Sequence, residues 1–431
     1  MPDEDRLPAI AATLRAAAGR FGTPLQVTDV ATIEAAGAEV RAAFPDPWLR
    51  QYSVKANDVP AIIGAAARAA GGGANVVSRG EWALARRAGI SNDAVTLEGV
   101  GKSDGDLREA VRAAAAGNPL RWVAVESAAE MTALAGLAAA AGLGRAGKAP
   151  LDVLARLNPD VAPETHPGLA VGAGRSKFGM SETELTAAVA LARTAGPGLR
   201  PRGVHLHVGS QLGAVDAWRD AVRRALATVA LLLGSDEAFD TLDVGGGFPV
   251  APVGEPSPRP ERFARELPPL LEALPPDRRP ARLAIEPGRY LVARAGWLLG
   301  RVLHARDRGG RQVVLDAGMT ELLRPALYGA RHGIVALTSE GRPVDDWTPG
   351  RDPTAAPVEV HGPICESTDA LGEHVLPRLQ RGDLVAIRDA GAYGSSLAST
   401  YNGRPRSPQV LIEPDGRLRL GRRRGSLASL G

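Results

Sequence analysis

The chain has 431 residues, 45% of them hydrophobic and 23% charged, which is the composition of an ordinary globular enzyme. A net charge of +3 and only 4% aromatic residues argue against a nucleic-acid-binding protein, and we interpret the arginines at 417, 419, 422, 423 and 424 as a solvated basic tail. The single cysteine excludes internal disulfides, the acidic start Met1–Asp5 lacks the order of a signal peptide, and no apolar run is long enough to span a membrane, so we expect a cytoplasmic protein.

In chain order, short β-prone runs alternate with Ala/Leu/Arg-rich helical segments over the first two-thirds of the chain. Strands are predicted at Gln51–Lys55, Ala74–Ser78, Ala94–Gly99, Arg121–Ser127, Asp152–Asn158, Gly203–Gly209, Thr241–Gly246 and Arg282–Gly288. Helices are predicted at Pro60–Ala70, Gly80–Ala88, Asp104–Ala116, Ala128–Ala141, Glu182–Ala195 and Ala217–Leu233. Eight such units favour a closed parallel (β/α)8 barrel, with an open doubly wound sheet as the alternative fold.

After Val292 the helical periodicity fades and a second, mostly β domain is predicted. Its β-prone runs are Trp297–Arg306, Gln312–Leu315, Pro357–Val360, Leu384–Arg388 and Val410–Glu413, and the early run Pro24–Thr28 joins them. We therefore divide the chain into a barrel at residues 45–295 and a β-rich domain formed by residues 1–44 and 296–431.

Lysine occurs at only four positions, 55, 102, 148 and 177. Arginine stays protonated and cannot form a Schiff base, so any such chemistry depends on one of these four. Lys55 ends the first predicted strand, where functional groups of a barrel gather, and its amine there is a candidate nucleophile. The alternative is a surface lysine that follows a strand.

The ends of the seventh and eighth predicted strands carry two further motifs. The triplet Gly245–Gly247 lets the backbone fold closely around an anion, and barrel phosphate sites often use this position, although a plain tight turn is the alternative. Glu286 begins the motif Glu286-Pro287-Gly288-Arg289, and a carboxylate there can keep a pyridine nitrogen protonated. The alternative is a structural Glu–Arg ion pair.

His205 and His207 end the sixth predicted strand and lie on the same side of it. Such a pair could ligate a metal ion, but no third ligand has suitable spacing, so we expect no metal. A flat imidazole that stacks on a cofactor ring is the preferred interpretation. Ser210 is placed to donate a hydrogen bond to a phosphate.

These motifs, in this order, resemble the fold-type III, alanine racemase-like decarboxylases that use pyridoxal 5'-phosphate (PLP), and most closely the bacterial diaminopimelate decarboxylases. The resemblance runs from about Thr23 to Ile412. It rests on Tyr52–Asn57, Gly101–Leu107, Thr165–His166, Ser176–Gly179, His205–Gln211, Asp243–Gly247, Glu286–Arg289, Asp316–Tyr328, Gly362–Ser367 and Asp389–Asn402.

The resemblance implies a role for each of these positions. Lys55 holds PLP, His207 stacks on its ring and Glu286 pairs with its nitrogen. The phosphate end is surrounded by Ser210, Gly245, Gly246, Gly247, Pro287, Gly288 and Arg289. A second amino-acid head on the substrate meets Arg289, Arg324 and Tyr328 at its carboxylate and Glu366 at its ammonium, with Tyr401 near cofactor and substrate. Cys365 protonates the decarboxylated carbon, and Cys365 and Glu366 come from the other subunit of a homodimer.

Three positions depart from the family pattern. The run Leu97–Lys102 replaces a His-Gly-Asn-Asn-Lys sequence, Asn75 stands where an acidic residue is usual, and Ser407–Gln409 replaces Pro-Ala-Glu. The expected reaction is meso-diaminopimelate to L-lysine. A decarboxylase of modified or carrier-protein-bound amino acids is the main alternative, and a non-catalytic PLP-binding protein or a racemase is ranked lower.

Overall fold

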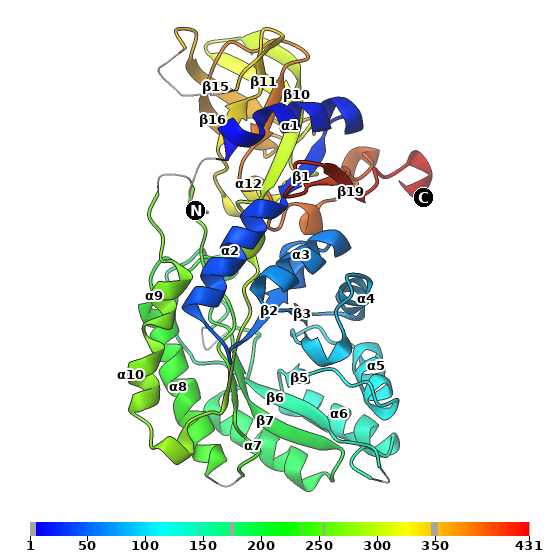
Figure 1. Cartoon of the computed structure of the whole chain (residues 1–431), viewed down its shortest axis with the longest axis vertical. Helices are drawn as coiled ribbons and strands as arrows, with labels where there is room; N and C mark the ends of the chain where they lie inside the picture. Colours follow the sequence, from blue (N-terminus) through cyan, green and yellow to red (C-terminus); the bar gives the residue numbers. More distant parts are fainter. Residues whose placement is uncertain are drawn as a thin grey trace.

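The computed structural model describes residues 6–145, 147–172, 176–234, 236–252, 255–345 and 352–430. The acidic start, Met1–Asp5, lies outside these residues. Figure 1 shows a barrel in the lower half of the molecule and a sheet-rich part above it. No helix in the described segments has both the length and the apolar character needed to cross a membrane.

Eight parallel strands close into the predicted barrel, and the alternative of an open sheet is wrong because the first of them pairs with the last. The strands are β2 (Leu49–Ser53), β3 (Gly73–Val76), β4 (Val95–Leu97), β5 (Trp122–Val125), β6 (Leu151–Leu157), β7 (Leu199–Leu206), β8 (Thr241–Asp243) and β9 (Arg282–Ile285). Each corresponds to one predicted strand.

The six predicted barrel helices are confirmed, and the structure adds short ones that the sequence analysis did not name. They are α3 (Pro60–Ala70), α4 (Arg79–Arg87), α5 (Asp104–Ala115), α6 (Ala128–Ala140), α7 (Glu182–Thr194) and α8 (Asp216–Leu233), followed by α9 (Pro260–Ala264), α10 (Leu267–Glu272) and α11 (Arg289–Val292). Ser78 and Ser127, at predicted strand ends, accept backbone N–H bonds as N-caps of α4 and α6.

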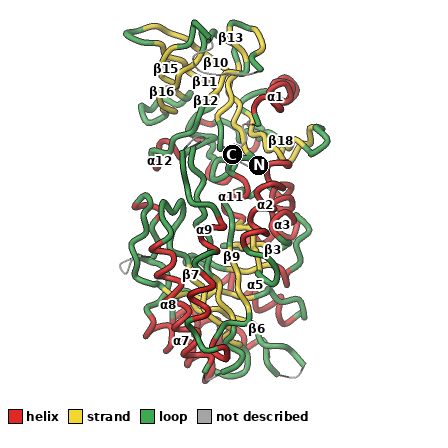
Figure 2. Tube along the Cα trace, turned by 60° about the vertical axis from the view of Figure 1, so that its left-hand side comes forward, coloured by secondary structure: helices red, strands yellow, loops and turns green. Residues whose placement is uncertain are grey.

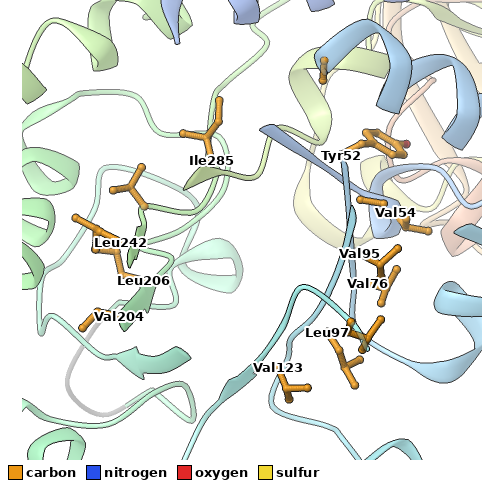
Figure 3. Close-up of a cluster of buried hydrophobic side chains, with 14 of the residues drawn as sticks. Tyr52, Val54, Val76, Val95, Leu97, Val123, Val204, Leu206, Leu242 and Ile285 are labelled. Atoms are coloured by element: carbon orange, nitrogen blue, oxygen red, sulfur yellow. The ribbon is translucent and has the colours of Figure 1, made fainter. Parts of the chain in front are cut away.

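Strand alternation divides the barrel side chains into two sets. Val204, Leu206 and Leu242 belong to the large apolar shell between strands and helices, and Figure 3 shows them opposite Val76, Val95 and Leu97. A small inner cluster contains Trp122, Ala124, Leu154 and Ala284. Since side chains alternate, His205 lies on the inner side of β7 between two outward residues, and the interior becomes polar toward the strand ends.

The second part of the molecule is a mixed sheet with the order β16-β15-β11-β10-β1-β18-β19, in which β17 also pairs with β10 and β12. Its strands are β1 (Leu25–Asp29), β10 (Gly296–Asp307), β11 (Arg311–Leu315), β12 (Ile334–Ala336), β15 (Ala356–His361), β16 (Ala370–Leu376), β17 (Leu384–Ile387), β18 (Gln409–Ile412) and β19 (Leu418–Arg422). A separate hairpin joins β13 (Thr338–Ser339) and β14 (Arg342–Pro343). The early strand β1 joins this sheet, as expected, and the structure places it between β10 and β18.

Two segments differ from the sequence analysis. The basic tail is not simply solvated, because β19 pairs with β18 and Arg419 forms an ion pair with Glu413. Helix α1 (Leu7–Phe21) packs on the sheet, whereas α2 (Val30–Ala43) contributes Val30, Ile33 and Val40 to the barrel shell. The division into residues 45–295 and residues 1–44 with 296–431 stays a prediction.

Helix α12 (Arg324–Tyr328) lies at the junction of the two parts (Figures 1 and 2).

Candidate active site

A cavity of about 580 Å³ opens at the carboxyl ends of the barrel strands. Seven of the predicted site residues line it: Lys55, His207, Ser210, Glu286, Arg289, Arg324 and Tyr328. The sequence analysis did not assign Glu81, Glu98, Arg156 or Tyr393, which line it as well. The cavity therefore brings together side chains from both parts of the molecule.

Lys55 lies in a single 3-10 turn, Val54–Ala56, directly after β2. Two hydrogen bonds tie this turn to the second part of the chain: Tyr393 N donates to the carbonyl of Ala56 at 2.8 Å, and Asn57 Nδ2 donates to the carbonyl of Gly391 at 3.0 Å. Burial raises the pKa of the neighbouring Glu81 carboxyl, and Lys55 partly opposes that shift. The amine is thus held at the cavity wall beside a carboxyl group.

The glycine triplet holds the ends of β7, β8 and β9 together. Gly246 N donates to His207 Nδ1 at 3.2 Å, and Glu286 N donates to the carbonyl of Gly245 at 2.9 Å. A Cβ at Gly246 would lie 2.4 Å from the carbonyl oxygen of Glu286, so only glycine fits there. The triplet, Pro287 and Gly288 do not themselves line the cavity, although Pro287 accepts a bond from Ser53 N and Gly288 precedes α11.

His207 presents an uncharged ring to the cavity. Burial, followed by the charge of Lys55, holds its pKa well below the usual range. Because its Nδ1 accepts the Gly246 N–H, the ring proton of the neutral form resides on Nε2. A neutral, flat imidazole of this kind can pack face to face on an aromatic ring.

A cluster of buried polar side chains, from the ends of four different strands, forms part of the cavity wall. His205 Nε2 is 3.2 Å from Glu98 Oε2 and 3.5 Å from Glu286 Oε1, and Asn75 Nδ2 donates to Glu286 Oε1 at 3.0 Å. Burial and then the charge of Glu286 raise the pKa of Glu98 to about 8, while burial lowers the pKa of His205 to about 4. At neutral pH, Glu98 is therefore protonated and His205 uncharged.

Glu98, His205 and Glu286 approach within 4.8 Å of one another, a spacing that could also accept a metal ion. His207 is not in this group, so the alternative of a metal held by the His205–His207 pair has no support among the described residues. The absence of a metal stays a prediction. Glu98 Oε1 and His205 Nδ1 have no hydrogen-bond partner among the described residues.

Two arginines, the buried Arg289 and the partly buried Arg324, form another part of the wall. Arg289 Nη2 donates to Ser210 Oγ at 3.1 Å, and its guanidinium lies 4.7 Å from the ring centre of Tyr393. Burial lowers the pKa of both guanidinium groups, that of Arg324 to about 10 with a further contribution from Arg289. Among the described residues no carboxylate pairs with either arginine, so the alternative of a structural Glu286–Arg289 ion pair is wrong.

Cys365, Glu366 and Tyr401 lie outside the cavity lining and are exposed on the surface. Tyr401 is 46% exposed, and its hydroxyl donates to the Glu366 carboxylate at 2.5 Å. Asn402 Nδ2 lies 3.5 Å from Cys365 Sγ. The three residues thus form one surface group rather than part of this chain's own cavity.

Comparisons with known proteins agree with this geometry. A family model described as "Pyridoxal-dependent decarboxylase, pyridoxal binding domain" matches residues 30–293. The diaminopimelate decarboxylase of Aquifex aeolicus is 35% identical over 96% of this chain and 91% of its own length, and that of Pseudomonas aeruginosa is 36% identical over 92% and 89%. The structure of the Helicobacter pylori diaminopimelate decarboxylase complexed with L-lysine covers 97% of this chain and 98% of its own, at 30% identity and a TM-score of 0.85.

The match of fold and sequence extends over nearly the whole chain. A Vibrio vulnificus lysine/ornithine decarboxylase, with 22% identity and a TM-score of 0.75, shares the fold only. The chain therefore belongs to the pyridoxal-dependent decarboxylases, in the diaminopimelate decarboxylase family.

Proposed function

We propose that this PLP-dependent carboxy-lyase converts meso-diaminopimelate into L-lysine and carbon dioxide. One observation carries the proposal: two guanidinium groups, the buried Arg289 and the partly buried Arg324, face a cavity beside Lys55 and form no ion pair with a carboxylate among the described residues. A cation removed from water without a counter-charge is costly, and a carboxylate of the ligand would supply that counter-charge.

The residues of the cavity fit PLP. When bound, PLP supplies an electron sink for the carbanion that loss of carbon dioxide leaves. Lys55 would hold its aldehyde carbon, the neutral ring of His207 would pack on its face, and Glu286 would face its ring nitrogen. Ser210, Arg289 and the backbone of the glycine triplet and of Pro287–Gly288 would surround its phosphate. Glu98 Oε1 and His205 Nδ1, which have no hydrogen-bond partner among the described residues, support a ligand at this end.

The distal head of the substrate accounts for the other polar groups. Diaminopimelate carries a second carboxylate and a second ammonium at its distal end. Lysine and ornithine have a distal ammonium but no distal carboxylate. Arg289, Arg324 and Tyr328 would hold the carboxylate, and Glu366 would hold the ammonium. The Helicobacter pylori structure complexed with L-lysine supports a site that accommodates this carbon chain.

A homodimer is part of the proposal. Cys365, Glu366 and Tyr401 are exposed on one chain, and a second copy would bring them to the cavity of its neighbour. There Cys365 would return a proton to the decarboxylated carbon. A cytoplasmic location is also proposed, as for other enzymes of amino-acid biosynthesis.

Carbon dioxide release from a panel of amino acids tests the function. The PLP-loaded enzyme should release it from meso-diaminopimelate and on the order of 10⁴-fold more slowly from lysine or ornithine, because those substrates leave the arginines unpaired. Arg324→Ala should lose most of the activity and keep its bound cofactor, whereas Arg306→Ala, on the exposed end of β10, should change neither. Feeble turnover of free diaminopimelate by fully loaded enzyme, unaffected by Arg324→Ala, would favour a modified or carrier-bound substrate instead.

A further inference from the structure

His332 is a buried histidine behind Arg324, between α12 and β12. Its Nε2 lies 3.0 Å from Arg324 Nη1, and its Nδ1 lies 2.9 Å from the carbonyl oxygen of Arg388. Arg388 in turn donates its backbone N–H to the carbonyl of Gly333 at 2.8 Å, which continues the pairing of β12 with β17. The imidazole is therefore fixed to the sheet on one side and to the arginine on the other.

The two contacts determine where the ring proton resides. A carbonyl oxygen can only accept a hydrogen bond, so Nδ1 of His332 must carry the proton that it shares with Arg388. Nε2 then has a free lone pair and accepts an N–H from the Arg324 guanidinium. Burial, together with the charge of Arg324, lowers the pKa of His332 to about 4, so the ring is uncharged at neutral pH and suited to accept.

An uncharged acceptor has a particular consequence at this position. Arg289 is buried, Arg324 is partly buried, and the two repel each other; the charge of Asp389 also acts on Arg324, but among the described residues no carboxylate forms an ion pair with it. A carboxylate in place of His332 would bind Arg324 more strongly but would neutralise it. The imidazole orients the guanidinium and leaves its full charge available to an anion in the cavity.

We propose that His332 is a positioning residue for substrate selection: it aims Arg324 at the distal carboxylate of the substrate without cancelling the charge that binds it. This inference rests on the proposed function and adds to it a second residue of the selectivity site, one that does not touch the substrate. A residue with this role acts on substrate affinity more than on the rate of the chemical step.

Three substitutions separate orientation, charge and mere packing. In His332→Gln the side-chain amide can still donate to the Arg388 carbonyl and accept from Arg324. His332→Leu removes both bonds, and His332→Glu keeps an acceptor but adds a negative charge. His374→Gln is the matched control, a half-buried histidine on β16 whose Nε2 contacts the carbonyl of Leu371 at 2.9 Å. Each PLP-loaded variant is measured for kcat and KM with meso-diaminopimelate, for melting temperature and for bound cofactor.

We expect His332→Gln and His374→Gln to stay within a few-fold of the wild type. His332→Leu and His332→Glu should raise KM on the order of 10- to 100-fold, as when a charge-assisted hydrogen bond is lost, with a smaller change in kcat. If the Leu variant does not fold, the comparison of Glu with Gln decides. A wild-type KM in the Glu variant would overturn the inference. So would the same fall in kcat and the same rise in KM in the Gln variant and the Glu variant. The proposed function fails separately, if the wild type does not turn over diaminopimelate at all.

Discussion

At the residue scale, Glu98 is the side chain whose difference from the family pattern has the clearest physical effect. It stands at the end of β4, in the run Leu97–Lys102 that differs from the family pattern, and it is buried against His205 and Glu286. Its pKa of about 8 means that the folded protein holds a proton that the unfolded chain releases above pH 4.5. The contribution of Glu98 to the free energy of unfolding therefore falls as pH rises from about 4.5 to about 8.

Glu98→Gln removes this dependence. In urea denaturation of the cofactor-free protein, the free energy of unfolding of the variant should rise relative to that of the wild type between pH 5 and pH 8. The rise should be no more than about 1.4 kcal/mol per pH unit, and the difference between the two proteins should be constant above pH 8. Glu373→Gln, at an exposed position on β16, should leave the pH dependence unchanged. Parallel curves for wild type and Glu98→Gln would show that Glu98 is ionised in the folded protein.

At the element scale, the loop after β8 determines how closely the barrel ends approach. Gly246→Ala would force a Cβ to within 2.4 Å of the Glu286 carbonyl, so the backbone of β8 or β9 must move. We expect destabilisation of about 1–3 kcal/mol and a clear loss of PLP affinity, measured by thermal unfolding and cofactor titration. Gly136→Ala is the control, since no atom lies near its added Cβ in α6, and it should stabilise by roughly 0.5–1 kcal/mol. An unchanged PLP affinity in Gly246→Ala would show that this loop does not contribute to the cofactor site.

At the scale of the whole molecule, the exposed group of Cys365, Glu366 and Tyr401 leads to a test of the dimer. Lys55→Ala and Cys365→Ala should each be nearly inactive when pure. After subunit exchange in an equal mixture, half of the dimers are hybrids in which one of two sites carries both wild-type groups, so activity should recover to about a quarter of the wild type. Exchange verified by differently tagged subunits, without recovery, would place Cys365 outside the partner's site.

The sequence by itself determined the elements and most of the cavity wall. Alternation and helical periodicity are local properties, so eight strands, six helices and the strand-end residues Lys55, His207 and Glu286 could be read directly. The same local patterns do not say where an element packs. Helix α2 was therefore missed, although its buried Val30, Ile33 and Val40 have helical spacing.

Only the tertiary structure decided which distant residues meet. Closing the barrel brings Asn75, Glu98, His205 and Glu286 from four strands into one buried cluster, and burial there makes a carboxyl protonated and an imidazole neutral. Packing of the sheet on the barrel places Tyr393 against the Lys55 turn and His332 behind Arg324. These contacts join segments far apart in the chain, and protonation follows from the resulting burial and charge, which no local sequence pattern encodes.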